Sequence, residues 1–114
     1  MDIFKKGETM DKKNLAHNVF FTLKDTSEAA VNTLIEDCYT YLKDLPGIIY
    51  FSAGSLIPEL NSNTNVTDYS VGLHVVFTSK SYHDQYQVAE KHKIFIKHNS
   101  ANWVKVRVFD TYVK

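Results

Sequence analysis

The sequence predicts one α+β domain of the ferredoxin-like type, in which a four-stranded antiparallel sheet carries two helices on one face. Four segments alternate between apolar and polar residues as strands do, and two segments repeat apolar residues every three or four positions as helices do. Their order along the chain is β-α-β-β-α-β. With 114 residues, of which 44% are hydrophobic, the chain can bury a single core, and a second domain is not expected.

Residues 1–14 are polar and predict a flexible N-terminal tail ahead of a domain over residues 15–114. The tail lacks the apolar stretch and the small-residue cleavage site of a signal peptide. The chain has one cysteine and no apolar run of the roughly 20 residues that a membrane span needs. A cytoplasmic protein without a membrane partner is therefore expected.

The first strand is expected over residues 15–24, where the residues alternate. His17 and Val19 share one face, and Phe20 lies on the other. Because both faces carry apolar side chains, the pattern is typical of a central strand that is covered on two sides.

The first helix is expected to begin after Asp25, which can cap it, with Glu28 three residues later at a capping-box spacing. Its apolar stripe consists of Val31, Leu34, Ile35, Cys38, Leu42 and Leu45. Such a stripe is typical of an amphipathic helix lying on a sheet, so Cys38 is expected to be a buried hydrophobe rather than a reactive thiol. Pro46 and Gly47 follow the helix and end it.

Two more strands are expected over residues 48–57 and 68–77, joined by a loop rich in asparagine and serine. In the earlier of the two, Gly54 can mark a bulge or a close backbone approach. In the later one, Tyr69 and the residues spaced by two from it form an apolar face, and His74 lies on the other face.

The second helix is expected to follow at once and to carry Tyr82 and Tyr86 on one side. Its pattern loosens near residues 90–93, after which the apolar run 94–96 predicts a packed continuation or an extra turn. The last strand is expected over residues 103–112, where valines alternate with charged residues.

This order places the first and third strands together at the centre of the sheet, where we expect parallel neighbours, with both helices on one face. The other face is then uncovered. The candidates to line it are Phe20, Tyr50 or Phe51, Val76 and the row from Val104 to Val108. Apolar residues on an open face predict a partner, most simply a second copy, so a homodimer joined through its sheets is expected.

The composition argues against several other partners. Lys and Arg together number 13, as do Asp and Glu, and there is no basic stripe, so neither nucleic acid nor an anionic membrane is an expected partner. The four glycines are scattered, which excludes a glycine-rich phosphate loop, and no cofactor is expected. The five histidines show no close ligand spacing, so no metal site is expected, and His83 is expected to face solvent.

An ordered set of short motifs resembles the stress-responsive A/B barrel, or Dabb, family. The motifs are His17 near the start of the first strand, residues 45–48, Gly54, residues 68–69, residues 76–79, Tyr86 with His92, and residues 108–110. The resemblance covers about residues 15–112. It implies a dimeric α+β barrel in which two four-stranded sheets face each other, in a family with many small stress-associated proteins.

One plant branch of that family contains olivetolic acid cyclase, a polyketide cyclase whose cleft uses a strand-one histidine and a helix-two tyrosine and histidine. Those positions match His17, Tyr86 and His92, whereas a further histidine of the cyclase falls on Val71. The resemblance implies that His92 takes a proton from carbon next to a carbonyl and that Tyr86 orients or protonates an oxygen. His17 would hold a substrate hydroxyl or assist the base.

The same three residues can instead form a satisfied polar network that fixes the helix on the sheet. An apolar pocket of roughly 300 Å³ or more that reaches His92 favours a ligand, and a filled interior favours the network. Three functions stay open. They are a non-enzymatic stress-responsive module with a site for a small hydrophobic ligand, a cyclase-like lyase, and, more distantly, a cofactor-free monooxygenase.

Overall fold

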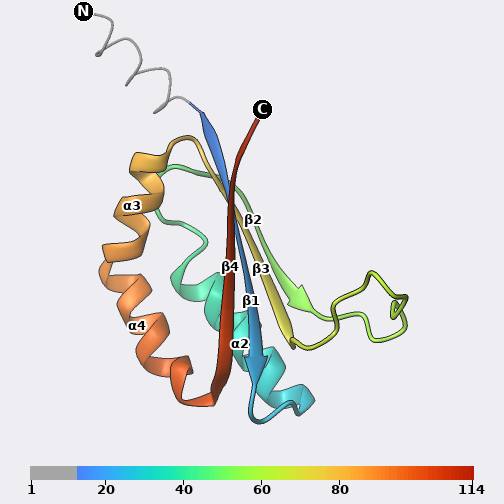
Figure 1. Ribbon diagram of the computed structural model, residues 1–114. Coiled ribbons are helices and arrows are strands. Elements are labelled where there is room, and N and C mark those ends of the chain that lie inside the picture. Colours follow the sequence, from blue (N-terminus) through green and yellow to red (C-terminus); the bar gives the residue numbers. More distant parts are fainter. Residues whose placement is uncertain (1–12) are drawn as a thin grey trace, which may run out of the picture.

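A computed structural model describes residues 13–114, so the predicted tail, apart from its last two residues, lies outside the described residues (Figure 1). The elements are β1 (Asn14–Leu23), α2 (Glu28–Tyr41), β2 (Ile48–Ser55), β3 (Val71–Phe77), α3 (Lys80–Val88), α4 (Glu90–Asn99), the 3₁₀ turn η1 (Ser100–Asn102) and β4 (Trp103–Val113). The predicted ferredoxin-like fold is confirmed, with a four-stranded sheet that carries its helices on one face. Within residues 13–114, no helix is long and apolar enough to cross a membrane.

The strand order is β2-β3-β1-β4, and every neighbouring pair is antiparallel. The prediction that β1 and β3 lie together at the centre is right, but the prediction that they are parallel is wrong. Each helical crossover passes over one strand, from β1 across β3 to β2 and from β3 across β1 to β4. The parallel strands are therefore second neighbours, and each central strand is antiparallel to both of its own neighbours.

The core lies between the sheet and the helices and follows the predicted alternation. Its buried hydrophobic residues are Leu15, Val19, Phe21, Leu23, Leu34, Cys38, Leu42, Val71, Leu73, Val75, Phe77, Tyr86 and Phe95. Cys38 is completely buried, as expected, and burial raises the pKa of its thiol to about 12. Such a thiol stays protonated and unreactive at neutral pH.

Two local predictions about the chain between β1 and β2 are wrong. Ser27, not Asp25, caps α2, because its hydroxyl accepts a hydrogen bond from the Ala30 amide, whereas the Asp25 carboxylate accepts one from the Ser27 amide. Glu28 is accordingly the first residue of the helix and not the third, as the capping box requires.

The sheet also differs from the prediction at two places in β2 and β3. The irregularity in β2 lies between Ile48 and Tyr50, and Gly54 pairs regularly with Gly72. Tyr69 precedes β3, so the alternation of the strand does not determine which face its side chain takes. Its ring packs against Phe20 on the uncovered face rather than on the core side.

The predicted second helix is two helices. Ala89 has extended backbone angles, φ −65° and ψ 143°, and this separates α3 from α4. The loosened pattern near residues 90–93 marks this break, because a new helix begins at Glu90 with its own apolar side.

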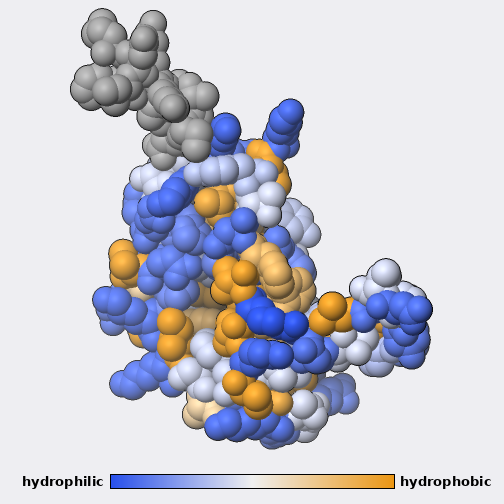
Figure 2. Space-filling model, viewed as in Figure 1, coloured by the Kyte–Doolittle hydropathy of each residue, from blue (hydrophilic) through white to orange (hydrophobic). Residues whose placement is uncertain are grey.

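The uncovered face of the sheet is partly apolar, but some of the residues on it differ from those predicted. Register places Tyr50 opposite Val76 and places Phe109 opposite Asn18 on this face. Val106 and Val108 pair with Phe21 and Val19, so they lie on the helix side and the predicted row is wrong there. Phe51, opposite Val75, is likewise on the helix side. Figure 2 shows that hydrophobic groups reach the surface in the region of β4.

Candidate functional site

A cavity of about 160 Å³ lies between the sheet and the two later helices. Three of its lining residues are the predicted site residues His17, Tyr86 and His92. Its apolar lining includes Val19, Phe21, Leu73, Phe95, Trp103, Val106 and Val108. We call this cavity the cleft.

The position of His17 follows from its strand. β1 is central, and alternation turns His17 toward the helices, where the residue is only 3% exposed. Its Nδ1–H donates to Oδ1 of Asp110, 2.5 Å away and directly opposite on β4. Because a carboxylate only accepts, this bond fixes the tautomer and leaves Nε2 with the free lone pair.

Burial lowers the pKa of His17, and the Asp110 hydrogen bond and charge only partly oppose this shift. The ring is therefore neutral at neutral pH. A neutral imidazole with a carboxylate at its far nitrogen is a competent proton acceptor, because the carboxylate stabilises the imidazolium that forms.

Tyr86 and His92 reach the cleft because of the break at Ala89. Six residues along a continuous helix would turn the two side chains roughly 120° apart around the axis. The extended residue between α3 and α4 removes that constraint, and the Tyr86 ring lies 4.8 Å from that of His92 and 5.8 Å from that of His17. The three predicted site residues therefore surround one space.

Their contacts differ from those expected. The His17 hydrogen bond goes to Asp110, and the rings of His17 and His92 meet Tyr86 edge-on. Burial raises the pKa of Tyr86, so its phenol stays protonated and keeps a proton that it can donate in a hydrogen bond. Burial is also the main cause that lowers the pKa of His92, followed by its proximity to His17 and His83.

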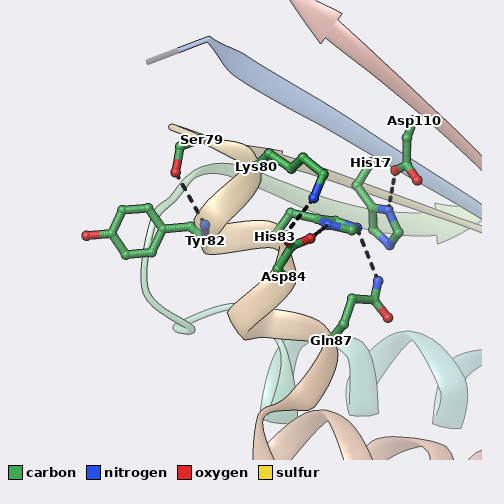
Figure 3. A network of polar contacts seen from close by, with 8 residues as sticks. All are labelled: His17, Ser79, Lys80, Tyr82, His83, Asp84, Gln87 and Asp110. Carbon is green, nitrogen blue, oxygen red and sulfur yellow. Dashed lines mark hydrogen bonds and ion pairs between the residues drawn. The ribbon is translucent and has the colours of Figure 1, made fainter. Parts of the chain in front are cut away.

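Sequence reasoning missed Asp110 and misplaced His83. The side chain of His83 is only 16% exposed, and its ring lies 5.0 Å from that of His17, so the expectation that it faces solvent is wrong (Figure 3). The sequence does contain a signal for the position of His83. It lies three residues before Tyr86, and residues at this spacing lie on the same face of a helix. Asp110 is 93 residues from His17, and only the β1–β4 register brings them together.

Two buried nitrogens at the cleft have no hydrogen-bond partner among the residues that the structure describes. They are Nδ1 of His92 and Nε1 of Trp103. An unpaired buried donor or acceptor costs about 1–3 kcal/mol. The protein side chains of the lining therefore leave these two nitrogens unpaired.

The cleft is open but smaller than the roughly 300 Å³ expected for a drug-sized ligand. Its volume is close to that of an engineered apolar cavity of about 150 Å³ that holds benzene. A polyketide chain exceeds this space. The geometry suits a molecule of one small ring with a few further atoms.

On the opposite face of the sheet, His74 lies apart from this site, as predicted. Its Nδ1 is 2.8 Å from Oδ1 of Asn18 on the neighbouring strand. Burial lowers its pKa.

Comparison with known proteins supports the fold. The family profile described as Stress responsive A/B Barrel Domain, Dabb, matches residues 15–113. A search of curated proteins gives no match.

Three solved structures illustrate the similarity. A Dabb-family protein with a ferredoxin-like fold from Mesorhizobium loti is 21% identical, with a TM-score of 0.74 over 90% of this chain and 98% of that one. A dimeric ferredoxin-like protein of unknown function from Thermobifida fusca is 12% identical, with a TM-score of 0.72 over 89% and 92%. A hydroxynitrile lyase from Passiflora edulis is 16% identical, with a TM-score of 0.73 over 90% and 95%. Identities this low establish a shared fold and nothing about chemistry.

Proposed function

This chain belongs to the Dabb family of stress-responsive A/B barrel domains, and on that premise we propose that it is a homodimer that binds a small, mostly apolar carbonyl or hydroxyl compound in the cleft. The observation that carries the ligand proposal is the unsatisfied lining. An apolar cavity of about 160 Å³ contains two buried nitrogens without a partner among the described residues. A ligand with an oxygen on a small ring supplies the missing contacts.

A second candidate function, a lyase that acts by proton transfer, is favoured by the pairing of His17 with Asp110. Nε2 of His17 takes a proton from carbon next to a carbonyl, and Asp110 stabilises the resulting imidazolium. The Tyr86 phenol donates to the carbonyl oxygen, on which negative charge develops. This assigns the base to His17 rather than to His92, because only His17 has a carboxylate partner.

The cyclase-like and oxygenase alternatives receive less support. The cleft volume argues against a polyketide substrate, and no feature of the lining favours oxygen chemistry over proton transfer. The hydroxynitrile lyase from Passiflora edulis shows that this fold accommodates a lyase. A reducing compartment such as the cytoplasm also suits the fully buried, unpaired Cys38.

Acetophenone tests both functions, because it combines one ring with a carbonyl and exchangeable methyl protons. We expect binding in proton NMR spectra and methyl exchange in D₂O at least about tenfold above buffer, since general base catalysis contributes ~10²–10⁴. Tyr86→Phe should weaken binding about five- to tenfold, the value of about one hydrogen bond. Tyr82→Phe, which changes a tyrosine outside the cleft lining, should change neither.

The outcomes separate the two functions. Binding without exchange supports a ligand-binding module and excludes the lyase for this class of substrate. No binding at millimolar acetophenone, or equal losses in Tyr86→Phe and Tyr82→Phe, contradicts the proposed cleft.

The proposed dimer joins the uncovered sheet faces, because this face carries apolar side chains that a second copy would cover. A neighbour of the same fold is described as dimeric. His74 lies on this face with a pKa already lowered by burial, and a second copy would bury it further. A lowered histidine pKa favours the neutral form, so the dimer is strongest where His74 is neutral in the free chain as well, and it weakens at lower pH, where the free chain binds the proton first.

Light scattering at micromolar concentration should therefore give twice the chain mass at pH 8 and a smaller mass near pH 5. His74→Gln should remove much of this pH dependence. A single-chain mass at pH 8 rules out the dimer, and a mass that is flat between pH 5 and 8 rules out the role of His74.

A further inference from the structure

A second group of polar side chains lies beside the cleft, on the side of β4. Within residues 13–114, His17, His83 and Asp110 are the group of three potential metal ligands that converge, with one ligand atom from each lying within 4.8 Å of the others. They come from β1, α3 and β4, so the tertiary fold alone assembles them (Figure 3). The proton-transfer chemistry above uses two of these residues and gives no role to His83.

The hydrogen bonds of His83 prepare it as a ligand. The Gln87 side-chain nitrogen lies 3.3 Å from Nε2 of His83, and an amide nitrogen only donates, so Nε2 accepts. Nδ1 then carries the proton and donates to Oδ1 of Asp84 at 3.1 Å. When a metal displaces the Gln87 amide, which is on an exposed side chain, Nε2 offers its lone pair while Asp84 holds the other nitrogen, the arrangement typical of metal-bound histidine.

We propose that His17, His83 and Asp110 bind a divalent transition-metal cation of the zinc type. Two imidazoles with one carboxylate suit Zn²⁺ or Co²⁺, whereas Mg²⁺ and Ca²⁺ prefer oxygen ligands alone. Ligand atoms of a tetrahedral zinc site lie roughly 3.3 Å apart, given metal–ligand distances of about 2.0–2.2 Å. Oδ1 of Asp110 lies 2.5 Å from Nδ1 of His17 because a proton lies between them, so the cation would take the place of that proton. Asp110 and His83, with side chains 42% and 16% exposed, would shift to reach the spacing of a zinc site.

The surroundings leave a coordination position for water. A hollow of about 220 Å³ is lined by His83, Asp110 and Lys80, among others. The Lys80 ammonium opposes a cation there, but it is paired with Asp84 at 2.7 Å. With Asp84 and Asp110 both present, the ionised groups around the site sum to a negative charge.

Metal binding and proton transfer compete for His17. A neutral imidazole has a single lone pair, so a ring that holds a cation cannot also accept a proton. We therefore expect Zn²⁺ to stop acetophenone exchange while acetophenone binding at Tyr86 persists.

The experiment uses the full chain without a histidine tag, freed of metal by EDTA dialysis. Titration with ZnCl₂ by calorimetry should give one ion per chain at micromolar concentrations, and Co²⁺ should produce visible absorption bands. His83→Gln and Asp110→Asn should each weaken binding at least tenfold. His98→Gln, at an exposed histidine of α4, should have no effect.

Two results overturn the proposal. One is the absence of Zn²⁺ binding by the wild-type chain at 100 µM metal, and the other is unchanged affinity in both His83→Gln and Asp110→Asn. Tyr86→Phe separates this site from the proposed ligand function, because it should weaken acetophenone binding and leave Zn²⁺ affinity intact.

Discussion

Replacement of Gly47 by alanine is expected to lower the free energy of unfolding by about 3 kcal/mol or more. Gly47 has φ +84°, which a residue with a Cβ adopts only at a cost of about 1–3 kcal/mol. An added Cβ would also lie 2.1 Å from Cγ of Tyr82, deep inside van der Waals contact. Overpacking of that kind costs typically a further 1–3 kcal/mol.

The substitution should also disturb the cleft, because Gly47 contacts the first turn of α3 and the chain just before it. Its carbonyl accepts the Thr78 amide at 2.9 Å, and Tyr82 lies against it in the first turn of the helix. The same helix carries His83 and Tyr86. We expect Gly47→Ala to weaken acetophenone binding as well as stability.

Urea unfolding provides the measurement, with Gly54→Ala as the matched control. A Cβ at Gly54 meets nothing within 4 Å, so that change should be neutral or stabilising by up to about 1 kcal/mol. In a chain that already carries Tyr82→Ala, Gly47→Ala should lower the free energy of unfolding by less than it does in the wild-type chain. Equal losses for the two glycine variants would show that the contact with Tyr82 does not matter.

Phe95→Ala is expected to cost about 3–5 kcal/mol, the usual range for a buried phenylalanine. Phe95 is 2% exposed on α4, and its ring lies 6.2 Å from that of Phe21 and 5.9 Å from that of Trp103. It closes the cleft opposite the sheet. Phe95→Leu, which keeps most of the volume, should lose less than about 1.5 kcal/mol.

The same truncation enlarges the cleft and should change its size preference. If about 160 Å³ limits the ligand, Phe95→Ala should bind 4-propylacetophenone more tightly, relative to acetophenone, than the wild-type chain does. NMR titration of both compounds at a temperature where the variant is folded checks this. An unchanged ratio would mean that ligands bind outside the cleft.

Much of the fold was predictable because the local pattern and the packing agree. The alternation from Leu15 to Leu23 and the stripe through Leu34, Cys38 and Leu42 record which side of each element is buried. His17, Tyr86 and His92 were found through a family resemblance. Their roles remain proposals.

The rest of the site depends on register, which periodicity does not encode, and on one backbone break, whose geometry the loosened pattern at residues 90–93 does not give. Asp110 becomes a partner of His17 only when β4 pairs beside β1 in this register. The turn at Ala89 needs no glycine or proline, so nothing in composition marks it. Val106 and Val108 were assigned to the wrong face because alternation gives two faces without saying which one the helices cover.

Adjacent residues of β1 serve opposite sides of the molecule. His17 holds Asp110 beneath the helices, and the next residue, Asn18, holds His74 on the far surface. A deletion or insertion of one residue in this strand would invert the whole arrangement, placing an amide inside and an imidazole outside. Insertions and deletions in β1 should thus be tolerated far less well than most single substitutions there. A shift of one residue moves every following side chain of the strand to the opposite face, so the contacts on both faces are lost together.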